Sequence, residues 1–265
     1  MSAPIWSPER SRARPLNVVI EPLTRFDLTG QRLLVTGAGR GLGRAIALGA
    51  VAAGAEVCAV DIDGQALATL QGQARCSTRV MDVTDRDGLL GVAADFGRLD
   101  GVVNNAMLIR YDPVESLSDE IIDRMVGIGV KGTLWGAQAL LRQMDASRGG
   151  VVLNMASPTA ERGFPGTAAY SMVKAAIGSI TRTLSAELGP RQVRVNALAP
   201  ASIPTPGAVA ITPLEEYERR AQRFPLRRIG READAVNAAL FLLSDAASFI
   251  TGEILHVDGG FLASA

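Results

Sequence analysis

The segment Tyr170–Lys174, YSMVK, places a phenol and an amine four residues apart. Residues at this spacing lie on one face of a helix, about one turn from each other. In one interpretation the tyrosine simply packs against the aliphatic part of the lysine side chain. In the other, the ammonium favours ionisation of the phenol, whose ordinary pKa is about 10. The pair alone does not choose between packing and proton transfer, so the surrounding elements must decide.

The composition is that of a globular protein, with 48% hydrophobic and 20% charged residues among 265. Lysine and arginine number 27, as do aspartate and glutamate, so the net charge is zero. Nothing in this balance attracts nucleic acid or an anionic membrane, and no apolar run near a helix is long enough to span a bilayer. Cys58 and Cys76 make neither a disulfide framework nor a zinc site, and no other spacing suggests a metal. We therefore expect a cytoplasmic protein.

The first 25 residues differ from the rest because they are rich in proline and arginine and show no regular periodicity. We expect a partly disordered arm, in which Leu16–Ile20 could form a short extended piece. Arg10, Arg12 and Arg14 are not followed by an apolar segment, so the arm does not read as a secretory signal. The arm could instead serve a scaffold protein as its contact segment, although only these arginines support that idea.

From Phe26 onward, short apolar runs alternate with longer helical patterns. The runs that predict strands are Arg32–Gly37, Ala55–Asp61, Leu99–Ala106, Gly149–Ser157, Gln192–Pro200 and Gly252–Gly260. Helices are predicted at Gly43–Gly54, Ser118–Ala146 and Ala169–Leu188. Continuous apolar strands separated by helices indicate a parallel sheet that is covered on both faces. Residues 26–265 are thus predicted to form one α/β domain with a doubly wound, Rossmann-like sheet.

A glycine-rich turn, TGAGRGLG at Thr36–Gly43, joins the first predicted strand to the first helix. Its glycines Gly37, Gly41 and Gly43 do not match the strict G-x-G-x-x-G pattern. They still allow a tight turn and a close approach of the backbone to a pyrophosphate at the helix N-terminus. The alternative is an ordinary turn between strand and helix. Its place in the first strand–helix unit favours a dinucleotide site.

Asp61 ends the second predicted strand, where an acidic side chain can accept hydrogen bonds from the adenosine ribose. Its charge would also repel the 2′-phosphate of NADP. Arg40 in the glycine turn favours NADP instead, but its side chain can swing to solvent. Ile62 and Asp63, which follow Asp61, add no positively charged residue. The sequence therefore favours NAD as the cofactor.

Several motifs in order make the chain resemble the short-chain dehydrogenase/reductase family over about Phe26 to Phe261. The matching segments are TGAGRGLG, Asp82-Val83, NNA at Asn104–Ala106, Ser157, YSMVK, RVNALAP, Thr205 and TGEILHVDGG. The resemblance implies that the dinucleotide contacts Gly37, Arg40, Gly41, Leu42, Gly43, Asp61, Ile62, Asp82, Val83, Asn105, Ala106, Tyr170, Lys174, Pro200, Ile203 and Thr205. It also implies a homotetramer in which the helices Ser118–Ala146 and Ala169–Leu188 pair across a two-fold axis.

The resemblance gives Ser157, Tyr170 and Lys174 catalytic roles. The tyrosine would take the proton of an alcohol while hydride passes to the nicotinamide, and reduction would run the same steps backward. Ser157 would hold the substrate oxygen, and Lys174 would hold the nicotinamide ribose. A tyrosine acting near neutrality needs its pKa lowered by roughly two to three units, which is about 3–4 kcal/mol. Lys174 and the cationic nicotinamide would supply that preference.

Three positions depart from the family pattern. Met107 follows NNA where glycine is usual, and Ala201 follows Pro200 where glycine is usual. Gly129 stands where the family has a fourth catalytic residue, an asparagine thought to hold a water that links the lysine to solvent. Gly127 and Gly129 are both poor helix formers. The change is either drift, as in a dinucleotide-binding relative with weak or no catalysis, or a relaxed helix whose carbonyl and water replace the amide.

The substrate pocket is harder to predict from the sequence. Its expected wall consists of Met107, Leu108, Pro158, Phe164, Pro165 and the segment Ala208–Phe224. These residues are mostly apolar, which suits a modest organic alcohol or ketone, although most could equally be packing residues. His256, the only histidine, lies in the last predicted strand, and we expect no catalytic role for it. The favoured function is an NAD(H)-dependent oxidoreductase that acts on a secondary alcohol or carbonyl compound.

Overall fold

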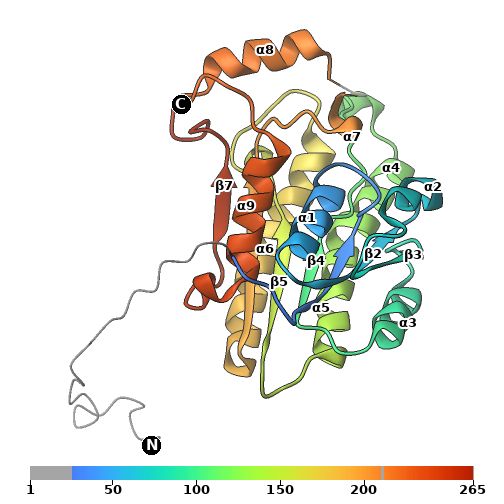
Figure 1. The fold of residues 1–265 in the computed structure, drawn as a ribbon. Helices are drawn as coiled ribbons and strands as arrows, with labels where there is room; N and C mark the ends of the chain where they lie inside the picture. Colours follow the sequence, from blue (N-terminus) through green and yellow to red (C-terminus); the bar gives the residue numbers. More distant parts are fainter. Residues whose placement is uncertain (1–25, 210–211, 265) are drawn as a thin grey trace, which may run out of the picture.

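The computed structural model describes residues 26–209 and 212–264. The predicted N-terminal arm lies outside the described residues. Within them, seven strands form one parallel sheet in the order β3-β2-β1-β4-β5-β6-β7 (Figure 1). The strands are β1 (Arg32–Thr36), β2 (Glu56–Asp61), β3 (Cys76–Val80), β4 (Gly101–Asn104), β5 (Gly150–Met155), β6 (Val193–Pro200) and β7 (Ile254–Val257). The predicted α/β fold is confirmed.

Nine α-helices connect or flank the strands in the described part of the chain. They are α1 (Gly41–Ala52), α2 (Gly64–Leu67), α3 (Arg86–Phe96), α4 (Asp119–Val126), α5 (Gly132–Gln143), α6 (Ala168–Leu188), α7 (Pro206–Val209), α8 (Leu214–Arg223) and α9 (Glu232–Leu243). A π-helical turn, Gly127–Lys131, lies between α4 and α5. Short 3₁₀ turns occur at Ala68–Leu70, Val114–Ser116, Pro158–Ala160, Gly189–Arg191 and Asp245–Ala247.

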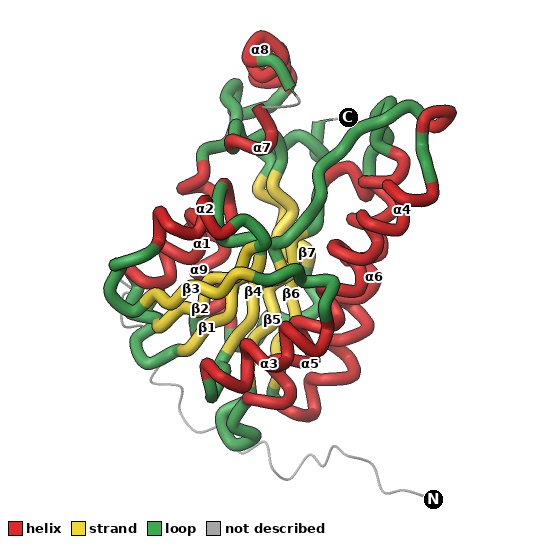
Figure 2. The backbone as a smooth tube through the Cα atoms, turned by 90° about the vertical axis from the view of Figure 1, so that its right-hand side faces the viewer, coloured by secondary structure: helices red, strands yellow, loops and turns green. Residues whose placement is uncertain are grey.

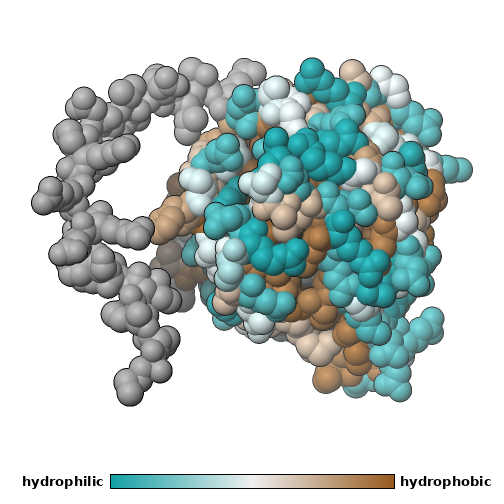
Figure 3. All heavy atoms as spheres, turned by 90° about the horizontal axis from the view of Figure 1, so that it is seen from below, coloured by the Kyte–Doolittle hydropathy of each residue, from teal (hydrophilic) through white to brown (hydrophobic). Residues whose placement is uncertain are grey.

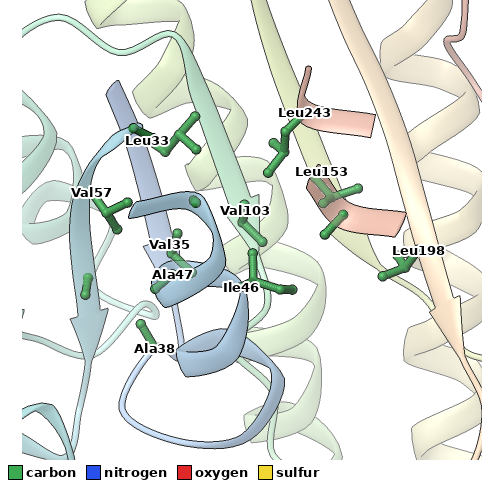
Figure 4. Close-up of a cluster of buried hydrophobic side chains, with 14 of the residues drawn as sticks. Leu33, Val35, Ala38, Ile46, Ala47, Val57, Val103, Leu153, Leu198 and Leu243 are labelled. Atoms are coloured by element: carbon green, nitrogen blue, oxygen red, sulfur yellow. The ribbon is translucent and has the colours of Figure 1, made fainter. Parts of the chain in front are cut away.

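Helices cover both faces of the sheet, α1 and α9 on one side and α3, α5 and α6 on the other (Figure 2). Strand β1 shows why its sequence is a continuous apolar run. Leu33 and Val35 point into the cluster under α1 and α9 (Figure 4), whereas Leu34 belongs to the cluster on the opposite face. Because successive side chains alternate between two buried faces, the three central positions, Leu33 to Val35, are all apolar.

The predicted strands are all present, with shorter bounds, but the sequence analysis missed β3. This strand reads CSTRV, and its last two residues are exposed. It pairs only with β2 and forms one edge of the sheet. An edge strand with an open side needs no continuous apolar run, so the pattern that revealed the other strands is absent here.

The helix predicted at Ser118–Ala146 is interrupted by the π-helical turn. Ser118 caps its start by accepting a hydrogen bond from the N–H of Ile121 at 3.4 Å. The two glycines of the turn, Gly127 and Gly129, weaken the regular helical pattern at this point. The π-helical turn is a local change in hydrogen-bond pattern at Gly129, and the replacement of the amide by a carbonyl and a water stays a prediction.

The sheet topology gathers the candidate residues at the edge formed by the carboxyl ends of the strands. The chain continues from β1 to β2 on one side, whereas β4 pairs with β1 on the other. At such a switch point the loops that follow the strands diverge and leave room for a ligand. Helices α7 and α8 stand beyond this edge of the sheet (Figures 1 and 2).

The opposite end of the molecule, seen from below, mixes hydrophilic and hydrophobic residues (Figure 3). Among the described residues, no helix combines the length and the apolar character that a membrane crossing requires.

Candidate active site

The glycine turn after β1 is tight and packs closely against the loop after β4. Gly37 has φ +64°, and a Cβ there would lie only 2.8 Å from the Cα of Ala106. The amide of Asn105 donates to the carbonyl oxygens of Thr36 and Gly37 at 3.0 and 2.9 Å, which fixes the turn against the loop after β4. Helix α1 begins at Gly41 without a side-chain cap from Arg40. Its first N–H groups therefore have no side-chain acceptor at the cap, as anion binding requires.

The carboxylate of Asp61 is held beside this turn. One of its oxygens accepts a hydrogen bond from the N–H of Gly39 at 2.8 Å, and the other accepts one from the N–H of Asp63 at 3.0 Å. A Cβ at Gly39 would lie 3.0 Å from the same carboxylate. Arg40 is exposed and makes no ion pair in the described part of the chain. The structure thus puts the predicted ribose acceptor next to the predicted phosphate turn.

The remaining predicted cofactor residues are only partly brought together. Thr205 lies over the turn, because a Cβ added at Gly41 would be 3.2 Å from the Cβ of Thr205. Ile203 and Val83 are buried. The other predicted cofactor residues have different surroundings. Leu42 packs on the core and Ile62 is exposed. The side chain of Asp82 accepts a hydrogen bond from the N–H of Thr84, and Pro200 is the last residue of β6.

Ser157, Tyr170 and Lys174 are all buried at the same edge of the sheet. Ser157 follows β5, and its Oγ accepts hydrogen bonds from the N–H and hydroxyl of Thr159 at 3.3 and 3.1 Å. Tyr170 and Lys174 lie in the first two turns of α6, and the lysine Nζ is 5.5 Å from the centroid of the phenol ring. The predicted helical spacing therefore does place the two side chains together.

The charges at this site differ from the expectation in one respect. Burial raises the pKa of Tyr170, as does the neighbouring Tyr111, while Ser157 acts in the opposite direction. Lys174 is not among the causes of this shift. Its Nζ donates to the carbonyl oxygen of Met155 at 2.5 Å, and burial lowers its own pKa to about 8. Desolvation therefore outweighs the lysine in the protein alone, and the expected lowering by Lys174 together with the cationic nicotinamide stays a prediction.

Comparison with known proteins shows the family of this chain. The family model described as enoyl-(acyl carrier protein) reductase matches residues 37–262. Gluconate 5-dehydrogenase of Gluconobacter oxydans is 35% identical over 249 residues, covering 90% of this chain and 97% of that protein. L-xylulose reductase of Bos taurus is 34% identical, covering 89% of this chain and 98% of that protein. The chain belongs to the short-chain dehydrogenase/reductase family.

A solved structure agrees with this family membership. Gluconate 5-dehydrogenase from Burkholderia cenocepacia, in complex with NADP and tartrate, superposes with a TM-score of 0.85 at 30% identity. The match covers 92% of this chain and all 100% of that one. As a short-chain dehydrogenase/reductase, the protein is an oxidoreductase that uses a nicotinamide dinucleotide and acts on alcohols or carbonyl compounds.

The family's asparagine position is filled by packing in this chain. A Cβ at Gly129 would overlap Cγ1 of Val173 and lie 2.9 Å from the sulfur of Met107. The carbonyl oxygen of Gly129 accepts a hydrogen bond from the hydroxyl of Thr133 at 2.7 Å. Two of the departures from the family pattern, Met107 and Gly129, are therefore in contact. The glycine leaves room for the side chains of Val173 and Met107, a packing role that the sequence analysis did not consider.

The predicted substrate wall is only partly correct. Met107 and Leu108 pack beside Tyr170 as expected, but Phe164 stacks on Phe261 with ring centroids 5.8 Å apart. The segment Ala208–Phe224 does line a pocket of about 400 Å³. Charged residues of α8 border this pocket together with Tyr111, Thr212 and Pro213. The charges are visible in the sequence of α8, LEEYERRAQR.

Sequence reasoning missed Tyr111, which also borders this pocket. Its ring meets that of Tyr170 edge-on, with centroids 5.5 Å apart and an interplanar angle of 81°. The signal available was weak: one of three tyrosines, placed soon after the NNA motif. Tyr111 thus covers the phenol that the sequence had singled out.

His256 makes a structural contact with Glu161. Its Nε2 is 2.8 Å from a carboxylate oxygen of Glu161, which ties β7 to the loop after β5. Among the described residues, no group of histidine, cysteine, aspartate and glutamate side chains could hold a metal ion.

Proposed function

We propose that this oxidoreductase is NAD(H)-dependent and transfers hydride between the nicotinamide and a secondary alcohol or the corresponding ketone. Tyr170 is the general acid and base, Ser157 binds the reacting oxygen and Lys174 supplies positive charge. The observation that carries this proposal is the burial of these three side chains together, beside a glycine turn shaped for a pyrophosphate. The experiment that tests it is turnover in Tyr170→Phe, argued in the Discussion.

The protein's own groups define two protonation states for this chemistry. Because burial raises the pKa of Tyr170, the phenol holds its proton at neutral pH and is ready to act as an acid toward a carbonyl oxygen. In oxidation the phenolate oxygen takes the hydroxyl proton while the C–H bond gives up hydride. When bound, the oxidised nicotinamide accepts that hydride and adds a positive charge that favours the phenolate. Lys174, with a pKa of about 8, is mostly protonated at pH 7 and places a positive charge 5.5 Å from the centre of the phenol ring.

The preference for NAD rests on Asp61. A fixed carboxylate at the end of β2 can accept hydrogen bonds from the two ribose hydroxyls and disfavours a 2′-phosphate. The structure of the Burkholderia relative contains NADP, so the family relatives do not all share this preference. Arg40, exposed beside the turn, is the residue that would otherwise assist NADP.

Replacing Asp61 should therefore relax the choice of cofactor. We expect Asp61→Ala to raise the KM for NAD about tenfold, since hydrogen bonds to a charged group contribute roughly 1.5–3 kcal/mol, and to lower the KM for NADP. Asp61→Asn keeps one acceptor oxygen but removes the charge, so it should gain NADP activity while losing less NAD affinity. Steady-state kinetics with both cofactors measures these changes. A wild-type protein that uses NADP better than NAD would contradict the assignment.

A second function, dinucleotide binding with weak or no catalysis, is kept because Gly129 replaces the family's asparagine. The retained Ser157, Tyr170 and Lys174 favour the enzyme.

Both cysteines are free thiols, which supports the proposed cytoplasmic location.

We also propose a homotetramer that pairs α4, α5 and α6 across a two-fold axis. Met172 of α6 supports this arrangement, since its side chain is 46% exposed although it is apolar. Light scattering at micromolar concentration should give a tetrameric mass, and a monomeric mass would refute the proposal.

A further inference from the structure

The pocket beside α8 adjoins the proposed reaction site without being part of it. It has a volume of about 400 Å³, and Tyr111 forms its inner wall. The ring of Tyr111 also contacts the ring of Tyr170. Tyr111 therefore lies between the pocket and Tyr170, whose phenol handles the proton.

Two acidic and two basic side chains of α8 border the pocket, namely Glu215, Glu216, Arg219 and Arg220. Glu216 accepts hydrogen bonds from both Arg219 and Arg220, with Arg220 Nε at 3.1 Å. These bonds hold the pKa of Glu216 below its usual value, with the bond from Arg220 as the largest cause. One carboxylate thus stands between two guanidinium groups, and the trio carries a net positive charge. Glu215 also borders the pocket but is exposed and pairs with neither arginine.

Arg220 is held in place with donor capacity to spare. Its Nη1 donates to the hydroxyl of Ser202 at 3.3 Å, in addition to the Nε bond with Glu216. Its Nη2 has no hydrogen-bond partner in the part of the chain that the structure describes. Its charge also acts on the hydroxyl of Tyr111, a side chain that is 40% exposed, where it opposes the rise in pKa that desolvation causes. A guanidinium fixed from two sides with one free nitrogen suits a carboxylate ligand.

We propose that Arg220 binds a carboxylate of the substrate, and that the natural substrate is therefore a hydroxy acid or the matching oxo acid. The reacting carbon lies at Ser157 and Tyr170, and the carboxylate lies beyond Tyr111 against α8. The Nη2 of Arg220 can donate a charge-assisted hydrogen bond to a carboxylate, and a neutral alcohol has no such charged acceptor. This inference names the substrate class for the reaction proposed above and rests on that proposal.

The kinetic test uses Arg220→Gln and, as a matched control, Arg223→Gln, which lies on the same helix but outside the pocket lining. A panel of hydroxy acids is compared with neutral counterparts of similar size, gluconate with sorbitol among them. The wild type should prefer the acids. Arg220→Gln should raise the KM for acids at least tenfold and leave kcat and the KM for neutral alcohols nearly unchanged. Equal losses for charged and neutral substrates would make Arg220 merely structural and overturn the proposal.

A binding measurement separates this inference from the proposed reaction. The shift in melting temperature on adding each hydroxy acid, with NAD present, should be seen in the wild type and Arg223→Gln but lost in Arg220→Gln. Binding of this kind without any turnover would uphold the carboxylate site and refute the proposed reaction. Turnover of neutral alcohols without a preference for acids or an Arg220-dependent shift would do the opposite.

Discussion

Tyr170→Phe is expected to lose nearly all turnover, at least about a hundredfold, because a positioned acid or base contributes roughly 10²–10⁴ to the rate. The change removes only the phenol oxygen and keeps the ring that contacts Tyr111 at 5.5 Å. Affinity for the dinucleotide should stay the same, since the oxygen serves proton transfer. Steady-state kinetics and a fluorescence titration with NAD measure the two quantities separately.

The matched control for this variant is Tyr217→Phe, which removes another buried phenol oxygen from a residue outside the reaction site. It should keep most of the wild-type activity. If Tyr170→Phe keeps its turnover as well, Tyr170 is not the general acid and base, and the mechanism proposed for this site is wrong.

Gly129→Asn is expected to lower both stability and turnover, although it restores the residue usual in the family. A Cβ at this position would overlap Val173 and come within 2.9 Å of the sulfur of Met107. Overpacking of this kind costs roughly 1–3 kcal/mol. Val173 directly precedes Lys174 on α6, so relief of the overlap shifts the lysine and slows proton transfer. Urea unfolding and kcat measure the two effects.

The same turn offers a control that differs only in its neighbours. A Cβ at Gly127 would meet nothing nearer than Thr84 at 3.4 Å, an ordinary contact. Gly127→Ala should therefore stabilise the protein by about 0.5–1 kcal/mol through lower backbone entropy of the unfolded chain, whereas Gly129→Ala should destabilise it. Combining Gly129→Asn with Met107→Ala and Val173→Ala should recover part of the stability. A rise in turnover in Gly129→Asn alone would instead indicate a decayed site that the asparagine repairs.

Features set by local pattern could be predicted from the sequence. The glycine turn, the apolar strands and the Tyr170–Lys174 spacing depend on residues close in the chain, and the structure places them as expected. Strand β3 escaped because an exposed edge imposes no apolar run.

Contacts between distant segments could not be predicted in this way. Met107, Gly129 and Val173 meet only because the loop after β4, the π-helical turn and α6 converge. The pKa of Tyr170 likewise depends on its burial and on Tyr111, neither of which its own segment encodes. The departures from the family pattern looked independent in the sequence, whereas the structure shows two of them to be neighbours.

The central claim is most directly tested by following hydride transfer itself. Purified protein is mixed with NAD and a panel of secondary alcohols, diols and hydroxy acids, and the absorbance of reduced cofactor is recorded for the wild type and for Tyr170→Phe. We predict that the wild type forms reduced cofactor with at least one substrate class and that Tyr170→Phe does not. A wild-type protein that binds NAD in a titration but forms no reduced cofactor with any member of the panel would contradict the claim and leave a dinucleotide-binding protein without this activity.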